Sequence, residues 1–291
     1  MYKPQGYVIS IITPFNKKGE LDENGFTKHV KSILETDLHG VLIGGSNGEG
    51  SSLSTEELRR IFDITVNVVS GKRQVICTPL RERTEDTLTL IKYCRDIGVD
   101  AVMIAPPYWI AGGDEGVYEY YKALATIDVP IVLYNQPTFY GGNLTPSFVK
   151  KLVKNIPQIV GMKEANPSIL QMQDQILLNG SNISIMSGSG GNTLPALVIG
   201  ARGVMTTWPE IVPDMAIELY DLVGKSKVDE ARRLNNKLLP LMRNVRNAPT
   251  LKAAFEMLGR PAGSVRLPLL PLKTDEKERI RDILQKLDLL S

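Results

Sequence analysis

The sequence is poor in the residues on which several classes of protein depend. Its 291 residues include two cysteines and two histidines, and 34 lysines and arginines nearly balance 32 aspartates and glutamates. Two cysteines are too few for a disulfide framework, which favours a reducing compartment. A net charge of +2 supplies no basic field for a phosphate backbone, so we expect no nucleic-acid partner.

Signals for secretion and for membrane insertion are also missing. The opening stretch MYKPQGYVISIITPF lacks the charged, apolar and small-residue zones of a signal peptide. No apolar run reaches the roughly 18 residues that cross a membrane. The sequence therefore predicts a soluble, cytoplasmic protein with no membrane partner.

What the chain does contain is a regular alternation of short β-branched runs with amphipathic stretches. Helix starts are marked by Ser54 before two glutamates, by Thr84 before Glu85 and by Thr145 before a proline. This rhythm is typical of βα units, and eight such units close into a TIM barrel. An open doubly wound sheet is the alternative, but no GxGxxG turn follows the first run. The eight expected strands begin at Tyr7, His39, Gln74, Ala101, Pro130, Ile159, Ile183 and Gly203.

The strand pattern stops near residue 225. Residues 227–245, 248–263 and 274–290 instead carry apolar side chains at helical spacing. We therefore predict a (β/α)8 barrel over residues 1–225 and a C-terminal helical extension over residues 226–291 that packs on the barrel.

In such barrels the reacting groups lie at the C-terminal ends of the strands. His29 and His39 fall in or beside the first expected helix, and no carboxylate cluster replaces them at the strand ends. We therefore expect no metal site and no Ser-His-Asp triad.

Lys163 stands in the apolar run IVGMKEA. Strand alternation places Ile159, Gly161 and Lys163 on one face, and Val160 and Met162 on the face that suits the helices. An ammonium group inside the barrel is desolvated, which lowers its pKa and frees a neutral amine for Schiff-base chemistry. The alternative is a structural lysine paired with a carboxylate such as Glu49.

Two further features can act with this lysine. Tyr134, one strand earlier, shares the inward face and could pass a proton at the barrel mouth, or could simply fill the top of the core. In the loop GGSNGEG, glycines such as Gly48 let backbone N–H groups turn toward a ligand, while Ser46 and Asn47 add donors suited to a carboxylate.

GGSNGEGSSLSTEE, LYNQPTFYGG and GMKEANPS, in this order and spacing, resemble the dihydrodipicolinate synthase / N-acetylneuraminate lyase family of lysine-dependent aldolases. The similarity covers essentially the whole chain. It implies a TIM barrel with a C-terminal helical extension and no metal or organic cofactor. It also implies a 2-oxo acid, usually pyruvate, bound as an imine, and a homodimer or homotetramer.

The resemblance also implies roles for individual residues. Lys163 resembles the imine lysine and Tyr134 the catalytic tyrosine, while Ser46 and Asn47 occupy the family's carboxylate-binding hydroxyl pair. Tyr108 matches a tyrosine that many members extend across a dimer interface, although here it could be only a rim aromatic.

Two further positions are identified in the same way. Met205 matches a residue whose backbone carbonyl often faces the tyrosine or the substrate. Gly188 lies where members vary their contacts to the second substrate.

Some positions depart from the family pattern. Phe139 stands where dihydrodipicolinate synthases carry an arginine, and Asn47 replaces their second loop hydroxyl. We therefore expect a member closer to the 4-hydroxy-2-oxoglutarate or sugar-acid aldolases. Arg81 and Arg83 could reach a polar tail of the second substrate, or could belong to a solvated charge run.

These observations predict a class I, pyruvate-dependent aldolase that cleaves or forms a C–C bond of a 2-oxo acid through a covalent imine with Lys163. Two alternatives use the same imine, namely a dihydrodipicolinate synthase-type condensation and a sugar-acid dehydration. A third alternative is an inactive barrel that binds a 2-oxo acid as a sensor.

Overall fold

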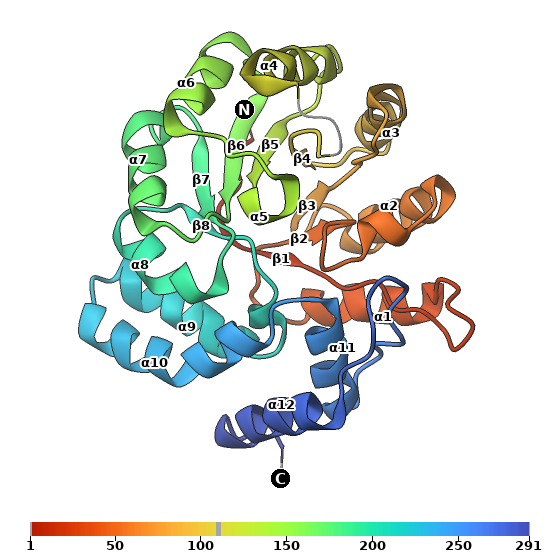
Figure 1. The fold of residues 1–291 in the computed structure, drawn as a ribbon. Helices are drawn as coiled ribbons and strands as arrows, with labels where there is room; N and C mark the ends of the chain where they lie inside the picture. Colours follow the sequence, from red (N-terminus) through yellow and green to blue (C-terminus); the bar gives the residue numbers. More distant parts are fainter. Residues whose placement is uncertain (1, 109–111, 291) are drawn as a thin grey trace.

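A computed structural model describes residues 2–108 and 112–290. Eight parallel strands form a closed barrel in chain order, as expected, and helices surround it (Figure 1). The strands are β1 Gly6–Ser10, β2 Gly40–Ile43, β3 Gln74–Cys77, β4 Ala101–Ile104, β5 Ile131–Asn135, β6 Ile159–Glu164, β7 Ser184–Ser187 and β8 Gly203–Val204. The barrel helices are α1 Glu23–Leu34, α2 Thr55–Val69, α3 Thr84–Asp96, α4 Gly113–Leu124, α5 Pro137–Tyr140, α6 Pro146–Asn155, α7 Ile169–Asn179, α8 Thr193–Val198 and α9 Pro213–Gly224.

Local sequence signals explain where several helices begin. Ser54 caps α2 in a capping box with Glu57, and Thr145 caps α6, whose first residue is a proline. Thr84 is not a cap, because it is already the first helical residue of α3 and the preceding Arg83 makes no side-chain cap. Two of the three expected helix starts are therefore confirmed, and the third lies one residue off.

Side chains from the strands divide into a barrel interior and a layer that faces the helices. Met162 faces the helices as expected, whereas Ile159 lies in the outer cluster and Val160 in the interior cluster, both contrary to the prediction. The reason is a β-bulge: Ile131 pairs with Ile159, but Val132 pairs with Gly161. The unpaired residue Val160 turns inward, because a bulge interrupts the two-residue alternation of a strand.

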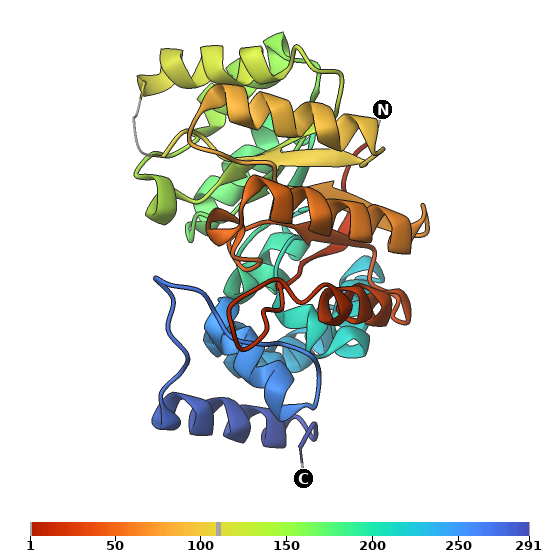
Figure 2. The ribbon, with the colours of Figure 1, turned by 90° about the vertical axis from the view of Figure 1, so that its right-hand side faces the viewer.

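Past the barrel, the chain forms α10 Val228–Asn244, α11 Ala248–Met257 and α12 Thr274–Lys286. Both views place these helices at one side of the barrel, with α11 beside α1 (Figures 1 and 2). The ring of His29 in α1 contacts that of Phe255 in α11, with 5.2 Å between centroids. Buried residues of all three helices belong to the same apolar cluster as the layer outside the strands.

No helix within residues 2–108 and 112–290 is long and apolar enough to cross a membrane.

Because the extension shares its core with the barrel, a cavity in α12 should weaken the whole chain. Leu284 is fully buried, so Leu284→Ala should lower the free energy of unfolding by about 2–5 kcal/mol. Leu177→Ala is the matched control, because Leu177 in α7 is 79% exposed and should cost under about 0.5 kcal/mol. Urea unfolding followed by circular dichroism measures both, and equal effects, or a separate transition for the extension, would contradict this packing.

Candidate active site

The C-terminal ends of β5 and β6 bring the two main candidate residues together. Tyr134 and Lys163 are direct partners in the strand register. The Lys163 Nζ atom lies 4.5 Å from the centroid of the Tyr134 ring. Both side chains are buried in the barrel interior. The inward orientation expected for each of them is therefore what the structure shows.

Burial determines the electrostatics of Lys163. The residue is 4% exposed, and desolvation lowers its pKa from 10.5 to about 8. The alternative of an ion pair with Glu49 is wrong, because Glu49 binds Lys252, with 2.6 Å between Oε1 and Nζ. Gly188 provides room beside Lys163, since a Cβ atom there would lie 3.0 Å from Lys163 Cγ. Lys163 is thus a buried amine whose charged form is destabilised.

Tyr134 keeps its proton at neutral pH. Burial raises its pKa to about 12, and a hydrogen bond with the Ser46 side chain opposes part of that rise. A protonated phenol hydrogen-bonded to a hydroxyl can give a proton to a ligand and recover it through that hydroxyl.

The loop between β2 and α2 carries the candidate anion cradle. Ser46 is exposed to the cavity described below, Asn47 is half-buried and Gly48 is buried. The Thr13 hydroxyl donates to the Gly48 carbonyl at 2.7 Å, which holds the loop against the end of β1. The loop conformation is therefore fixed by contacts outside it.

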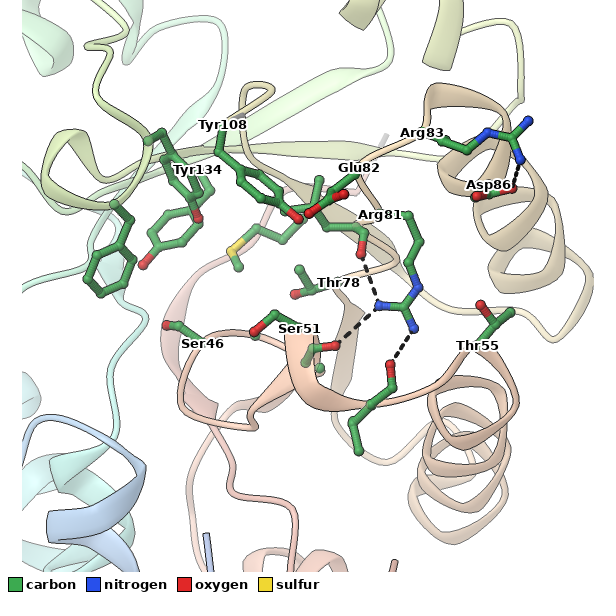
Figure 3. A pocket seen from close by; sticks show the side chains of 18 of the residues that line it. Ser46, Ser51, Thr55, Thr78, Arg81, Glu82, Arg83, Asp86, Tyr108 and Tyr134 are labelled. Carbon is green, nitrogen blue, oxygen red and sulfur yellow. Dashed lines mark hydrogen bonds and ion pairs between the residues drawn. The ribbon is translucent and has the colours of Figure 1, made fainter. Parts of the chain in front are cut away.

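Ser46 and Tyr134 line a cavity of about 560 Å³, whereas Lys163, Asn47 and Gly48 are not among its lining residues (Figure 3). Ser46 and Tyr134 lie toward one end of it, and Tyr108 stands between them and the arginines. Tyr108 lines the cavity of its own chain, where burial first and then the Glu82 carboxylate raise its pKa. Phe139 also lines the cavity and is 57% exposed.

Arg81 and Arg83 differ in their surroundings. The Arg81 guanidinium donates to the carbonyls of Leu53 at 2.8 Å and Gly50 at 3.3 Å, and burial lowers its pKa (Figure 3). Arg83 is exposed and lies 3.7 Å from an Asp86 carboxylate oxygen. Both arginines line the cavity, Arg81 held by the backbone and Arg83 exposed to solvent, and a contact of either with the second substrate stays a prediction.

Sequence reasoning missed two features of the site. The Tyr140 ring contacts those of Tyr134 and Tyr108, with centroids 5.7 and 6.3 Å apart. Behind the site, the Asn135 amide donates to both oxygens of the buried Glu164, at 2.9 and 3.1 Å. The signal for this bridge was present, because each of its residues directly follows Tyr134 or Lys163.

Met205 and Gly188 are the remaining predicted positions of the site. Met205 is fully buried in the barrel interior, and its backbone N–H donates to the Ser187 carbonyl at 2.7 Å. Neither the substrate contact proposed for its carbonyl nor that proposed for Gly188 is tested. In the part of the chain that the structure describes, no three His, Cys, Asp or Glu residues are grouped as metal ligands would be.

Comparison with known proteins agrees with this geometry. The 4-hydroxy-tetrahydrodipicolinate synthase of Methanocaldococcus jannaschii is 34% identical over 290 residues, which cover 98% of this chain and 99% of that protein. The same enzyme of Methanopyrus kandleri is 35% identical over 295 residues, with 99% and 98% covered. The expectation that other aldolase types would be closer is therefore not supported.

Solved structures give the same result. The dihydrodipicolinate synthase of Thermotoga maritima matches with a TM-score of 0.95 and 30% identity, over 99% of this chain and all of that one. The chloride-inhibited dihydrodipicolinate synthase of Acinetobacter baumannii, complexed with pyruvate, matches with a TM-score of 0.94 and 28% identity, over 98% and 99% of the chains. The model of the dihydrodipicolinate synthetase family matches residues 3–287, and the chain belongs to that family.

Proposed function

We propose that this protein condenses pyruvate, held as an imine of Lys163, with an aldehyde. The observation that carries the proposal is the desolvated Lys163 amine packed against Tyr134, whose side chain lines an open cavity. The names of the relatives support condensation, and one related structure holds pyruvate. The sequence alone indicates a dihydrodipicolinate synthase-type condensation only as an alternative, and we now prefer it to cleavage as the main reaction.

The residues divide the chemistry between them. The neutral Lys163 amine attacks C2 of pyruvate, and the carbinolamine loses water after Tyr134 protonates its hydroxyl. Ser46 and Asn47 bind the carboxylate through side-chain and backbone donors. The Tyr134 phenolate takes a C3 proton, which gives an enamine whose C3 attacks the aldehyde carbon. Tyr134 then protonates the new alkoxide, and water hydrolyses the new imine to free Lys163. The protonated imine accepts the electron pair, so the proposal requires no metal or organic cofactor.

Aldol cleavage of a 4-hydroxy-2-oxo acid is the second candidate, and it uses the same imine in reverse. Phe139 favours it for substrates whose aldehyde product is uncharged, because this exposed aromatic residue at the cavity adds no charge to hold a carboxylate. Both candidates share the Lys163 step and differ in the partner that occupies the outer cavity.

Borohydride reduction should fix pyruvate to the chain. We expect one reduced pyruvyl group, on the tryptic peptide that contains Lys163, because desolvation lowers the pKa of this amine to about 8 and leaves much of it neutral near that pH. The control is Lys163→Met, which keeps an apolar stem and should take up no label. Labelling at other lysines, or none while a known family member is labelled in parallel, would overturn the imine proposal. Absence of any label would instead favour the alternative of an inactive barrel that binds a 2-oxo acid as a sensor.

Product analysis separates the two candidates. With pyruvate and aspartate semialdehyde, we expect a kcat/KM at least about tenfold above that for cleavage of 4-hydroxy-2-oxoglutarate, about 1.4 kcal/mol in transition-state free energy. Both reactions are followed by coupled pyruvate assay on one enzyme preparation. The reverse order would assign cleavage, and turnover of a 2-oxo-3-deoxy sugar acid alone, without release of pyruvate, would assign dehydration.

A further inference from the structure

A buried ion pair joins the cradle loop to the C-terminal extension. Glu49 directly follows Ser46-Asn47-Gly48 and is 2% exposed, and its Oε1 atom lies 2.6 Å from Nζ of Lys252 in α11. Its Oε2 atom accepts the backbone N–H of Arg266 at 2.8 Å. Both carboxylate oxygens are thus bound by the extension, whose residues lie more than 200 positions away in sequence.

Glu49 is in turn coupled to the residues that face the cavity. Its φ of 53° lies in the left-handed region, which is unfavourable for a residue with a side chain. Its backbone N–H donates to the Ser46 carbonyl at 3.2 Å, and the next N–H, of Gly50, donates to the Gly45 carbonyl at 3.1 Å. A shift of Glu49 therefore acts directly on the backbone of Ser46.

The extension is itself anchored on both sides of this contact. Lys252 Nζ also donates to the Ser264 carbonyl at 2.6 Å. The Arg266 guanidinium binds both oxygens of Glu57, at 2.6 and 2.7 Å, and so attaches to the first turn of α2. The Lys252 and Arg266 cations lie over the Phe15 ring, at 4.4 and 4.1 Å from its centroid.

We propose that Lys252 is a positioning residue for the carboxylate cradle, acting through Glu49 on Ser46. The inference rests on the proposed function, in which Ser46 and Asn47 bind the carboxylate of pyruvate. Loss of the ammonium leaves a buried, unpaired carboxylate, which is strongly unfavourable. Glu49 then turns toward water and leaves its left-handed conformation, and the Ser46 donors move away from the ligand.

The test measures the pyruvate concentration that gives half-maximal borohydride trapping. Lys252→Met removes the cation but keeps the apolar stem. Glu49→Gln weakens the same contact from the side of the loop, because the new amide NH2 group is a donor and cannot accept the backbone N–H of Arg266. We expect each variant to raise the half-saturating concentration at least about tenfold, since small displacements of binding groups have effects of this order. At saturating pyruvate, Lys163 should still be labelled, and that result checks the proposed function separately.

The matched control is Leu284→Ala, which weakens the extension without touching the loop. It should change the half-saturating concentration less than about twofold, whatever its effect on the melting temperature. The inference is overturned if folded Lys252→Met stays within twofold of the parent protein, or if Leu284→Ala raises the value equally. If Lys252→Met does not fold, Glu49→Gln decides by the same criteria.

Discussion

The exclusion of water from one amine, that of Lys163, is the constraint on which the rest of the site depends. A lysine in water stays protonated near pH 7 and is a poor nucleophile, whereas burial disfavours its charged form. The closed barrel supplies the apolar surroundings, and Gly188 leaves the space through which the side chain passes. Had Glu49 paired with Lys163, the amine would have remained charged, so the diversion of that carboxylate to Lys252 is equally important.

Around this amine, polar groups are arranged in pairs that fix the strand ends. Tyr134 and Lys163 face the interior in register, and the next residues in the same two strands, Asn135 and Glu164, bind each other on the outer side. A hydrogen bond between buried polar groups of neighbouring strands resists any slip that would separate the reacting pair. The C-terminal extension has a similar structural role for the loop that carries Ser46, because Lys252 of the extension binds Glu49 of that loop.

Much of the fold and part of the site follow from local sequence patterns. The βα rhythm predicts each strand near its observed start, because alternation and helix caps depend on residues close in sequence. Val160 was placed on the wrong face because a bulge depends on the pairing of two strands. The contact between Glu49 and Lys252 links residues 203 positions apart, so no local pattern indicates it. Phe139 was given too much weight, because one substituted position says less about relatives than the whole chain does.

The central claim is tested most directly by the pH dependence of imine formation. The initial rate at which cyanoborohydride traps subsaturating pyruvate on Lys163 should follow the fraction of neutral amine. We predict that it rises about tenfold per pH unit below a midpoint near 8 and then levels off, as the lowered pKa requires. A rate that keeps rising toward pH 10.5, the ordinary value for lysine, would show a solvated amine and contradict the account.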